Sequence, residues 1–216
     1  MTSSQIDIHP RLQEVVSRHL EHRWQQPIRE HNRAVFTELA GTVDLQSLIF
    51  DLGCGVGEST TWLARQHPDC LVVGVDRSAA RLRVAGATSD LHRTGNKVLV
   101  RSDVEDFVRL AVQSQWRAKQ IWLLYPNPSP KSAQLKRRWH AHPVWPDMLA
   151  LGGRLEMRTN WKIYALEMQW TLNYCQRPAS VSVLADDHQP ITPFERKYQG
   201  SGQPLYRVNT KRRVLQ

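Results

Sequence analysis

The chain has 216 residues, a length that fits one α/β domain with an extension and allows much of its surface to be buried. Hydrophobic residues make up 41% of the sequence and charged residues 23%, which are ordinary values for a globular protein and exclude a disordered or fibrous chain. Lysine and arginine number 29 against 20 acidic residues, and the resulting net charge of +9 favours a polyanionic partner.

Several classes of protein are not indicated. No apolar run approaches the roughly 20 residues of a membrane span, and residues 1–10 lack the basic segment and apolar core of a secretory signal. The three cysteines lack C-x-x-C spacing and the nine histidines lack metal-ligand spacing. We therefore expect a cytoplasmic protein without a metal site or a membrane partner. The sequence does not indicate the oligomeric state.

Two helices are predicted before residue 47, because apolar residues recur at helical spacing between residues 11 and 40. Pro27 separates them, since a proline inside a helix loses a hydrogen bond and clashes with the preceding turn. The predicted organisation is a helical extension over residues 1–46 and an α/β domain over residues 47–216. The role of the extension is not indicated.

From residue 47 onward, strand and helix patterns alternate. This alternation predicts an α/β fold with a mostly parallel sheet, right-handed crossovers and ligands at the carboxyl ends of the strands. Helices are predicted over residues 57–66, from Ser78 to about Leu91, over 104–113, over parts of 135–150 and over 161–174. Strands are predicted over residues 48–51, 71–75, 97–101, 118–124, 154–159, 180–185 and 205–208.

Three alternating glycines follow the first predicted strand, in the pattern D-x-G-x-G-x-G that begins at Asp51. Glycine is needed where the backbone passes close to a ligand or takes positive φ, although an ordinary glycine turn is the alternative. A dinucleotide fold would have its third glycine one position later. The carboxylate suits a ligand that carries ammonium and sulfonium charge. The loop resembles the cofactor loop of class I methyltransferases, which bind S-adenosylmethionine.

Two further acids end predicted strands. Asp76 lies 23 positions after Gly53, where an acid accepts both ribose hydroxyls of an adenosine cofactor, and Asp103 ends the third strand, where the methyltransferase pattern places a group that binds the adenine amino group. The alternative role for both is that of a charge at a helix N-terminus. The cofactor-binding set that the resemblance implies is Asp51, Gly53, Gly55, Gly57, Asp76, Arg77, Asp103, Val104 and Asn127.

A proline-rich loop follows the fourth predicted strand. Residues 125–131 read Y-P-N-P-S-P-K, and their three prolines favour a rigid extended loop. Lys131, Lys136, Arg137 and Arg138 place four cations next to it. A solvated charge run is one interpretation, and contact with RNA phosphates is the other. Trp139, Trp145 and Trp161 lie near this basic segment, as core residues or as stacking partners for RNA bases.

The proline loop is similar to the P-D-P-W-P-K-x4-K-R-R segment of the tRNA (guanine-N7-)-methyltransferase family. Residues 159–164 are similar to its T-D-W-x-x-Y motif and residues 192–196 to its T-x-F-E-R motif. The resemblance implies methyl transfer from S-adenosylmethionine to N7 of a guanine in tRNA, or in another structured RNA. It also implies a Rossmann-like fold with a seven-stranded, mostly parallel sheet and helices on both faces, formed by residues 47–216.

The same resemblance assigns further roles. Asn127 takes the catalytic position, and the cations of the basic segment bind phosphates. The residues that orient the base are Asn160, Thr192 and Glu195.

Asn127 and Asn160 stand where the family has acids, Ser129 stands where it has tryptophan, and its histidine before K-R-R is absent. Two alternatives therefore stay open: a divergent methyltransferase acting on another RNA or a small molecule, and a non-catalytic RNA-binding protein with this fold.

Overall fold

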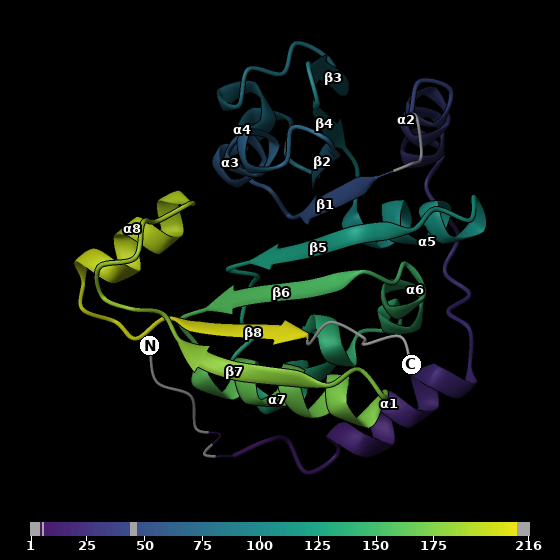
Figure 1. Ribbon diagram of the computed structural model, residues 1–216. Coiled ribbons are helices and arrows are strands. Elements are labelled where there is room, and N and C mark those ends of the chain that lie inside the picture. Colours follow the sequence, from purple (N-terminus) through teal and green to yellow (C-terminus); the bar gives the residue numbers. More distant parts are fainter. Residues whose placement is uncertain (1–4, 6, 44–46, 211–216) are drawn as a thin grey trace, which may run out of the picture.

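The computed structural model describes residues 5, 7–43 and 47–210. Within these residues, eight strands form one sheet in the order β3-β4-β2-β1-β5-β6-β8-β7 (Figure 1). The strands are β1 (Leu48–Leu52), β2 (Leu71–Asp76), β3 (Leu91–Thr94), β4 (Lys97–Arg101), β5 (Ala118–Leu124), β6 (Arg154–Thr159), β7 (Ala179–Val183) and β8 (Tyr206–Thr210).

The centre of the sheet is parallel. β1 pairs in parallel with β2 on one side and with β5 on the other, and this parallel region extends to β4 and β6. β3 and β8 join antiparallel to β4 and β6, and β7 pairs antiparallel with β8. The strand order reverses between β1 and β5, so the loops after these two strands flank the point where such sheets bind ligands.

Helices cover both faces of the sheet, because adjacent residues of a buried strand point to opposite sides. Phe50 of β1 contacts Phe107 on one face, while Ile49 packs with Leu63 on the other. The helices are α1 (Leu12–Glu21), α2 (Glu30–Ala40), α3 (Glu58–Gln66), α4 (Ala79–Val84), α5 (Val104–Gln113), α6 (Trp145–Ala150), α7 (Lys162–Tyr174) and α8 (Pro193–Gly200), with the 3₁₀ helices η1 (Ser132–Arg137) and η2 (Trp139–Ala141).

The expected fold class is confirmed, with one strand more than the seven predicted. The helix predicted to reach Leu91 ends at Val84, because Gly86 takes a φ of 91° and the chain then turns into β3. β3 forms a hairpin with β4 through a two-residue loop, and Thr94 pairs with Lys97 at its base. Three of its four side chains are polar and none is buried, so the sequence showed no strand pattern there.

The two N-terminal helices form on either side of Pro27, as predicted. Leu12, Val15 and Val16 of α1 are buried in a cluster with Leu135, and α2 packs on α5. The boundary predicted between residues 46 and 47 stays a prediction, since residues 44–46 lie outside the described ranges. Among the described helices, none combines the length and the apolar character that crossing a bilayer requires.

Candidate active site

The loop between β1 and α3 contains three glycines in the left-handed region. The φ angles of Gly53, Gly55 and Gly57 are 83°, 59° and 70°. The amide of Gly53 donates to the carbonyl oxygen of Val75 at 2.8 Å, which holds the loop against the end of β2. At Gly57 a Cβ atom would lie 2.7 Å from the Cβ of Ala85, so glycine also permits close contact with the end of α4.

Asp76 joins this glycine loop to the start of α4. Its Oδ2 accepts a hydrogen bond from the amide of Gly55 at 3.0 Å, and its Oδ1 accepts one from the amide of Ser78 at 2.8 Å. The residue is 5% exposed, and Nη1 of Arg81 lies 3.7 Å from Oδ2. A carboxylate oxygen accepts more than one hydrogen bond, so Asp76 is held in one orientation and keeps acceptor capacity for a ligand.

A cavity of about 560 Å³ lies at this edge of the sheet, within the range of sites for small organic ligands. Its lining includes Trp139, Gln134 and Glu105. The predicted cofactor-binding residues that line it are Gly53, Asp76, Arg77, Asp103, Val104 and Asn127, and Arg137 of the predicted RNA-binding set joins them. Residues from four separate strand ends therefore meet at one cavity.

The start of α2 contacts Asp103, a residue that lines this cavity, which the sequence did not indicate. Oδ2 of Asp103 accepts hydrogen bonds from Nη1 of Arg29 at 2.8 Å and from Nδ2 of Asn32 at 3.0 Å. Asn32 also donates to Asp106 at 2.7 Å. The start of α2 is thus attached to the start of α5, and the N-terminal segment orients a carboxylate of the cavity. Only the folded chain brings these residues together, because more than 70 positions separate them.

Asp51 does not line the cavity. It is fully buried beneath α3, where Oδ2 accepts hydrogen bonds from Oγ of Ser59 at 2.6 Å and Oγ1 of Thr60 at 2.7 Å. Burial raises the pKa of Asp51 to about 6, although the two hydroxyl donors act in the opposite direction. Asp51 therefore positions the first turn of α3. Gly55 and Gly57 also lie outside the cavity lining.

The proline loop begins with a residue in an uncommon conformation. Tyr125 has a φ of 51°, and its amide donates to the carbonyl oxygen of Arg158 at 2.8 Å. Oδ1 of Asn127 accepts from the amide of Ser129 at 3.1 Å, which makes a local turn at the end of β5. Asn127 is exposed and lines the cavity. The rigid loop predicted here carries the residue in the catalytic position to the cavity.

The four cations after the proline loop divide into two kinds. Lys131, Lys136 and Arg137 are exposed. Arg138 is 2% exposed and donates from Nη1 to Oε2 of Glu167 at 2.5 Å and from Nε to the carbonyl oxygen of Ser129 at 3.2 Å. We therefore withdraw Arg138 from the set expected to contact phosphates, because its guanidinium is enclosed and paired.

Glu167 stands at the centre of this buried group. His140 contributes Nε2 at 3.0 Å from Oε2 of Glu167, and the amide of His9 donates to Oε1 at 2.9 Å. Burial acts to raise the pKa of Glu167, but His140 and Arg138 outweigh it and lower the pKa to about 2. The cluster fastens η1 and η2 to α7 and to the segment before α1.

The T-x-F-E-R segment forms the first turn of α8, and two of its members are internal. Thr192 caps the helix by accepting from the amide of Glu195 at 3.0 Å. The carboxylate of Glu195 is fully buried and accepts from Nη1 of Arg158 at 2.8 Å, from the amide of Ile191 at 2.7 Å and from the hydroxyl of Tyr125 at 3.2 Å. In this structure both residues hold α8 in place, and neither lines the cavity of Asp76.

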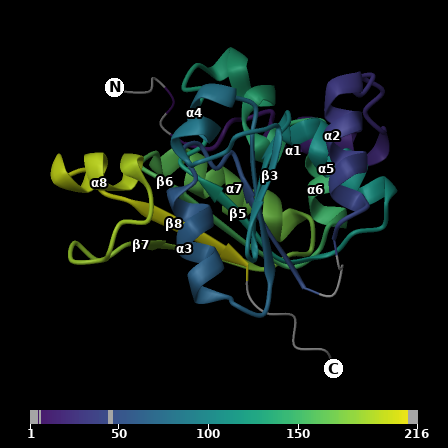
Figure 2. The ribbon, with the colours of Figure 1, turned by 90° about the horizontal axis from the view of Figure 1, so that it is seen from above.

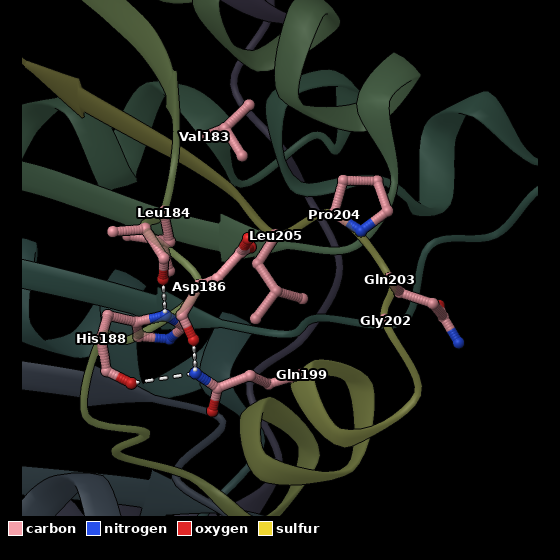
Figure 3. A pocket seen from close by; sticks show the side chains of 10 residues that line it. Val183, Leu184, Asp186, His188, Gln199, Gly202, Gln203, Pro204 and Leu205 are labelled. Atoms are coloured by element: carbon pink, nitrogen blue, oxygen red, sulfur yellow. Dashed lines mark hydrogen bonds between the residues drawn. The ribbon is translucent and has the colours of Figure 1, made fainter.

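A second hollow, of about 300 Å³, lies between α8 and residues 183–188 (Figure 3), and Asn160 contacts one residue of its lining. Its Nδ2 donates to Oε1 of Gln203 at 2.8 Å, and Gln203 lines that hollow. Figure 3 shows Gln199 of α8 donating to the carbonyl oxygens of Asp186 and His188, at 2.6 and 3.0 Å. Asn160 is thus separate from the residues that line the larger cavity.

One group of potential metal ligands occurs in the described part of the chain. Side-chain atoms of His67, Asp69 and Cys70 lie within 4.8 Å of one another. Nζ of Lys119 lies 3.0 Å from Oδ2 of Asp69 and 3.2 Å from Sγ of Cys70, so an ammonium group already neutralises this cluster.

Comparisons with known proteins agree with this geometry. Residues 45–208 match the profile of a family described as putative methyltransferase. A tRNA (guanine-N(7)-)-methyltransferase of Nitrosomonas europaea is 27% identical, over 72% of this chain and 75% of its own length. An enzyme of the same name from Treponema pallidum is 27% identical over 74% of this chain and 65% of its own length, and one from a Nocardioides species is 29% identical over 94% and 83%.

Solved structures support the fold. The chain superposes on an antibiotic-related methyltransferase with a TM-score of 0.58 and 15% identity, over 86% of this chain and 96% of the other. A 16S rRNA methyltransferase named KamB gives a TM-score of 0.56 with 16% identity, over 86% and 94%. The Rossmann-like methyltransferase fold, the lining of one cavity by strand-end acids and the profile match lead to one conclusion: the chain belongs to the putative methyltransferase family, as its motifs predicted.

Proposed function

We propose that this protein transfers a methyl group from S-adenosylmethionine to N7 of a guanine in tRNA. The observation that carries the proposal is the meeting of Gly53, Asp76, Asp103 and Asn127 at one cavity whose rim includes the exposed Arg137. The curated relatives bear the name of this activity.

The cavity fits the cofactor in size and in its donor set. Its volume of about 560 Å³ suits a nucleoside with an amino-acid tail. Asp76 accepts hydrogen bonds at the end of β2, where ribose hydroxyls would bind, and Asp103 accepts at the start of α5 beside the apolar Val104, where an adenine would bind. Gly53 lets the backbone approach the ligand without a Cβ in the way.

The protein's part in the reaction is positioning. When bound, S-adenosylmethionine supplies an electrophilic methyl group on a sulfonium. N7 of guanine carries a lone pair, so no side chain has to remove a proton before attack. Asn127 orients the base edge with its amide, and the fixed proline loop holds that amide at the cavity. Holding nucleophile and methyl group in line is the main source of rate enhancement.

The RNA would approach over the basic segment. Lys131, Lys136 and Arg137 are exposed beside the cavity, where they can contact phosphates. Such contacts position the RNA but do not distinguish one RNA sequence from another. Glu195, Thr192 and Asn160 contribute indirectly, since their hydrogen bonds hold α8 and the chain around it.

The proposal is tested by incubating unmodified tRNA with the protein and labelled S-adenosylmethionine, followed by borohydride and aniline treatment. Label in 7-methylguanosine, with cleavage at the labelled guanine, is the expected result. Asp76→Ala should weaken cofactor binding about tenfold to a hundredfold in calorimetry, because it removes the carboxylate proposed to accept from the ribose hydroxyls and the hydrogen bonds by which that carboxylate holds Gly55 and Ser78. Asp187→Ala, at an exposed position outside the cavity, is the matched control. A cofactor-bound protein that produces no cleavage would rule out the N7 assignment.

A second acceptor is favoured by one observation. Asn127 offers an amide where related motifs carry a carboxylate, and an amide both donates and accepts hydrogen bonds. Nucleoside mass spectrometry of total RNA from the same reaction separates the two possibilities. If the protein is a weakened guanine methyltransferase, Asn127→Asp should raise guanine methylation. If the acceptor is another base, the same change should abolish methylation of that base.

A further inference from the structure

An aromatic series runs from the end of β5 to the surface of α8. The rings of Tyr125 and Tyr198 have centroids 5.8 Å apart, and those of Tyr198 and Phe194 are 6.3 Å apart with an interplanar angle of 25°. Phe194 is 49% exposed, while the other two rings are partly buried. Phe194 and Tyr198 lie four positions apart and share one face of the helix.

We propose that the exposed ring of Phe194, backed by Tyr198, is a stacking platform for the acceptor base. This inference rests on the proposed function and adds to it the residue that receives the base. A base that reacts outside its helix loses its stacking neighbours, and an aromatic side chain replaces them. The ligand is a purine of RNA turned out of its stack.

The position of the aromatic series beside the cofactor cavity supports the acceptor base as the ligand of Phe194. Tyr125 lies two positions before Asn127, which lines the cofactor cavity, so the platform begins at the same loop as the residue in the catalytic position. Nη2 of Arg196 lies 2.7 and 2.9 Å from the two carboxylate oxygens of Glu58, the first residue of α3 after the glycine loop. In Figure 1 the arrowheads of β5 and β6 point toward α8, so this helix lies at the carboxyl edge of the sheet.

The conformation of Tyr125 also points to function. A φ of 51° is uncommon for a residue with a side chain and persists only where surrounding contacts enforce it. Here the amide donates to Arg158 and the hydroxyl donates to Glu195 at 3.2 Å. The strained turn directs the ring of Tyr125 toward Tyr198 and away from a regular continuation of β5.

The platform helix is fixed on several sides while the ring of Phe194 stays exposed. Glu195 pairs with Arg158, and Gln199 binds two carbonyl groups of the preceding segment (Figure 3). Figure 2 shows α8 projecting past the rest of the molecule. A rigidly presented ring loses little entropy when a base stacks on it, which suits a positioning residue.

The test compares Phe194→Leu, which keeps an apolar side chain without a π-face, with Phe194→Tyr, which restores one. Phe194→Leu should lower kcat/KM for tRNA methylation about 5- to 100-fold, leave S-adenosylmethionine affinity unchanged and be rescued in Phe194→Tyr. Tyr174→Leu removes another exposed aromatic, stacked on Trp170 of α7, and serves as the matched control with activity near that of the unaltered protein.

A second readout does not depend on activity. Ultraviolet crosslinking of the protein to tRNA, with S-adenosylhomocysteine bound, should give a nucleotide adduct on Phe194, located by peptide mass spectrometry and lost in Phe194→Leu. Methylation by Phe194→Leu at the unaltered rate, or crosslinks that spare residues 193–200, would overturn the platform. An adduct on Phe194 without any guanine methylation would instead refute the proposed reaction and support the platform. Neither adduct nor methylation would refute both.

Discussion

Asp51 is fully buried, and its two carboxylate oxygens have different surroundings. Oδ2 accepts from Ser59 and Thr60, while Oδ1 has no hydrogen-bond partner among the described residues. A charge in such a place is poorly stabilised, and burial raises the pKa of Asp51 to about 6. The protein tolerates this group because it fixes the start of α3 next to the glycine loop.

Asp51→Asn should therefore change the pH dependence of stability. The folded pKa lies above the ordinary aspartate value near 4, so the folded state binds the extra proton and the unaltered protein loses stability as the pH rises from about 4 to 6. Asparagine does not titrate. We compare the unfolding free energy of Asp51→Asn with that of the unaltered protein. The difference, variant minus unaltered protein, should increase by about 2 to 3 kcal/mol between pH 4 and pH 6 and stay constant at higher pH.

Urea unfolding between pH 4 and pH 8 measures this difference. Asp187→Asn, an exposed position, is the control and should show no such trend. A difference for Asp51→Asn that stays constant across the range would show that Asp51 titrates in the folded protein as it does in water.

At the scale of elements, the buried group around Glu167 holds η1, η2 and the N-terminal segment on α7. Arg138 and Arg137 are adjacent in sequence, yet only Arg138 points inward, to Glu167. Removing one partner of a buried pair leaves the other charge without compensation, which is costlier than the pair's own net contribution.

Arg138→Met should lower the unfolding free energy by about 3 to 5 kcal/mol at pH 7, whereas the exposed Arg137→Met should change it by less than about 0.5 kcal/mol. The pKa of Glu167 is lowered to about 2, so the stability that this pairing contributes is complete above about pH 4.5 and is lost as the pH falls toward 2. The difference in unfolding free energy between Arg138→Met and the unaltered protein should therefore become smaller as the pH is lowered, which thermal unfolding at several pH values measures. Equal losses for the two arginine variants would contradict the assignment of Arg138 to the interior.

For the whole molecule, the charge of +9 matters through its distribution. Lys136 and Arg137 lie near the cavity at the carboxyl edge of the sheet, while Lys119 and Arg154 lie in the first residues of β5 and β6, at the opposite edge. Cations that contact phosphates displace counterions, and each such contact steepens the salt dependence of binding.

Replacing Lys136 and Arg137 by glutamine should weaken tRNA binding and reduce the slope of log K against log salt by about 1.5 to 2. Replacing Lys119 and Arg154 by glutamine removes the same amount of charge from the amino edge of the sheet and should leave this slope nearly unchanged. Filter binding at salt concentrations from roughly 50 to 300 mM, where the Debye length is on the order of 10 Å, provides the comparison. Equal slopes for the two double variants would place the RNA elsewhere.

The chain by itself determined the alternation of strand and helix, the glycine loop and the acids at or just after the ends of β2 and β4. These are local patterns, and the geometry of a parallel sheet brings its strand ends to one edge, so Asp76, Asp103 and Asn127 could be expected at one site. The family also followed from ordered motifs along the sequence.

Only the tertiary structure decided which of several similar residues serve the cavity. Asp51 and Asp76 both lie near the carboxyl ends of strands, but Asp51 is buried under α3 while Asp76 lines the cavity. Arg138 is internal because Glu167 lies opposite it, 29 positions away, and Asp103 is oriented by α2, more than 70 positions before it. Burial and pairing depend on contacts between segments far apart in the chain, and no local pattern encodes which partner a charged side chain will meet.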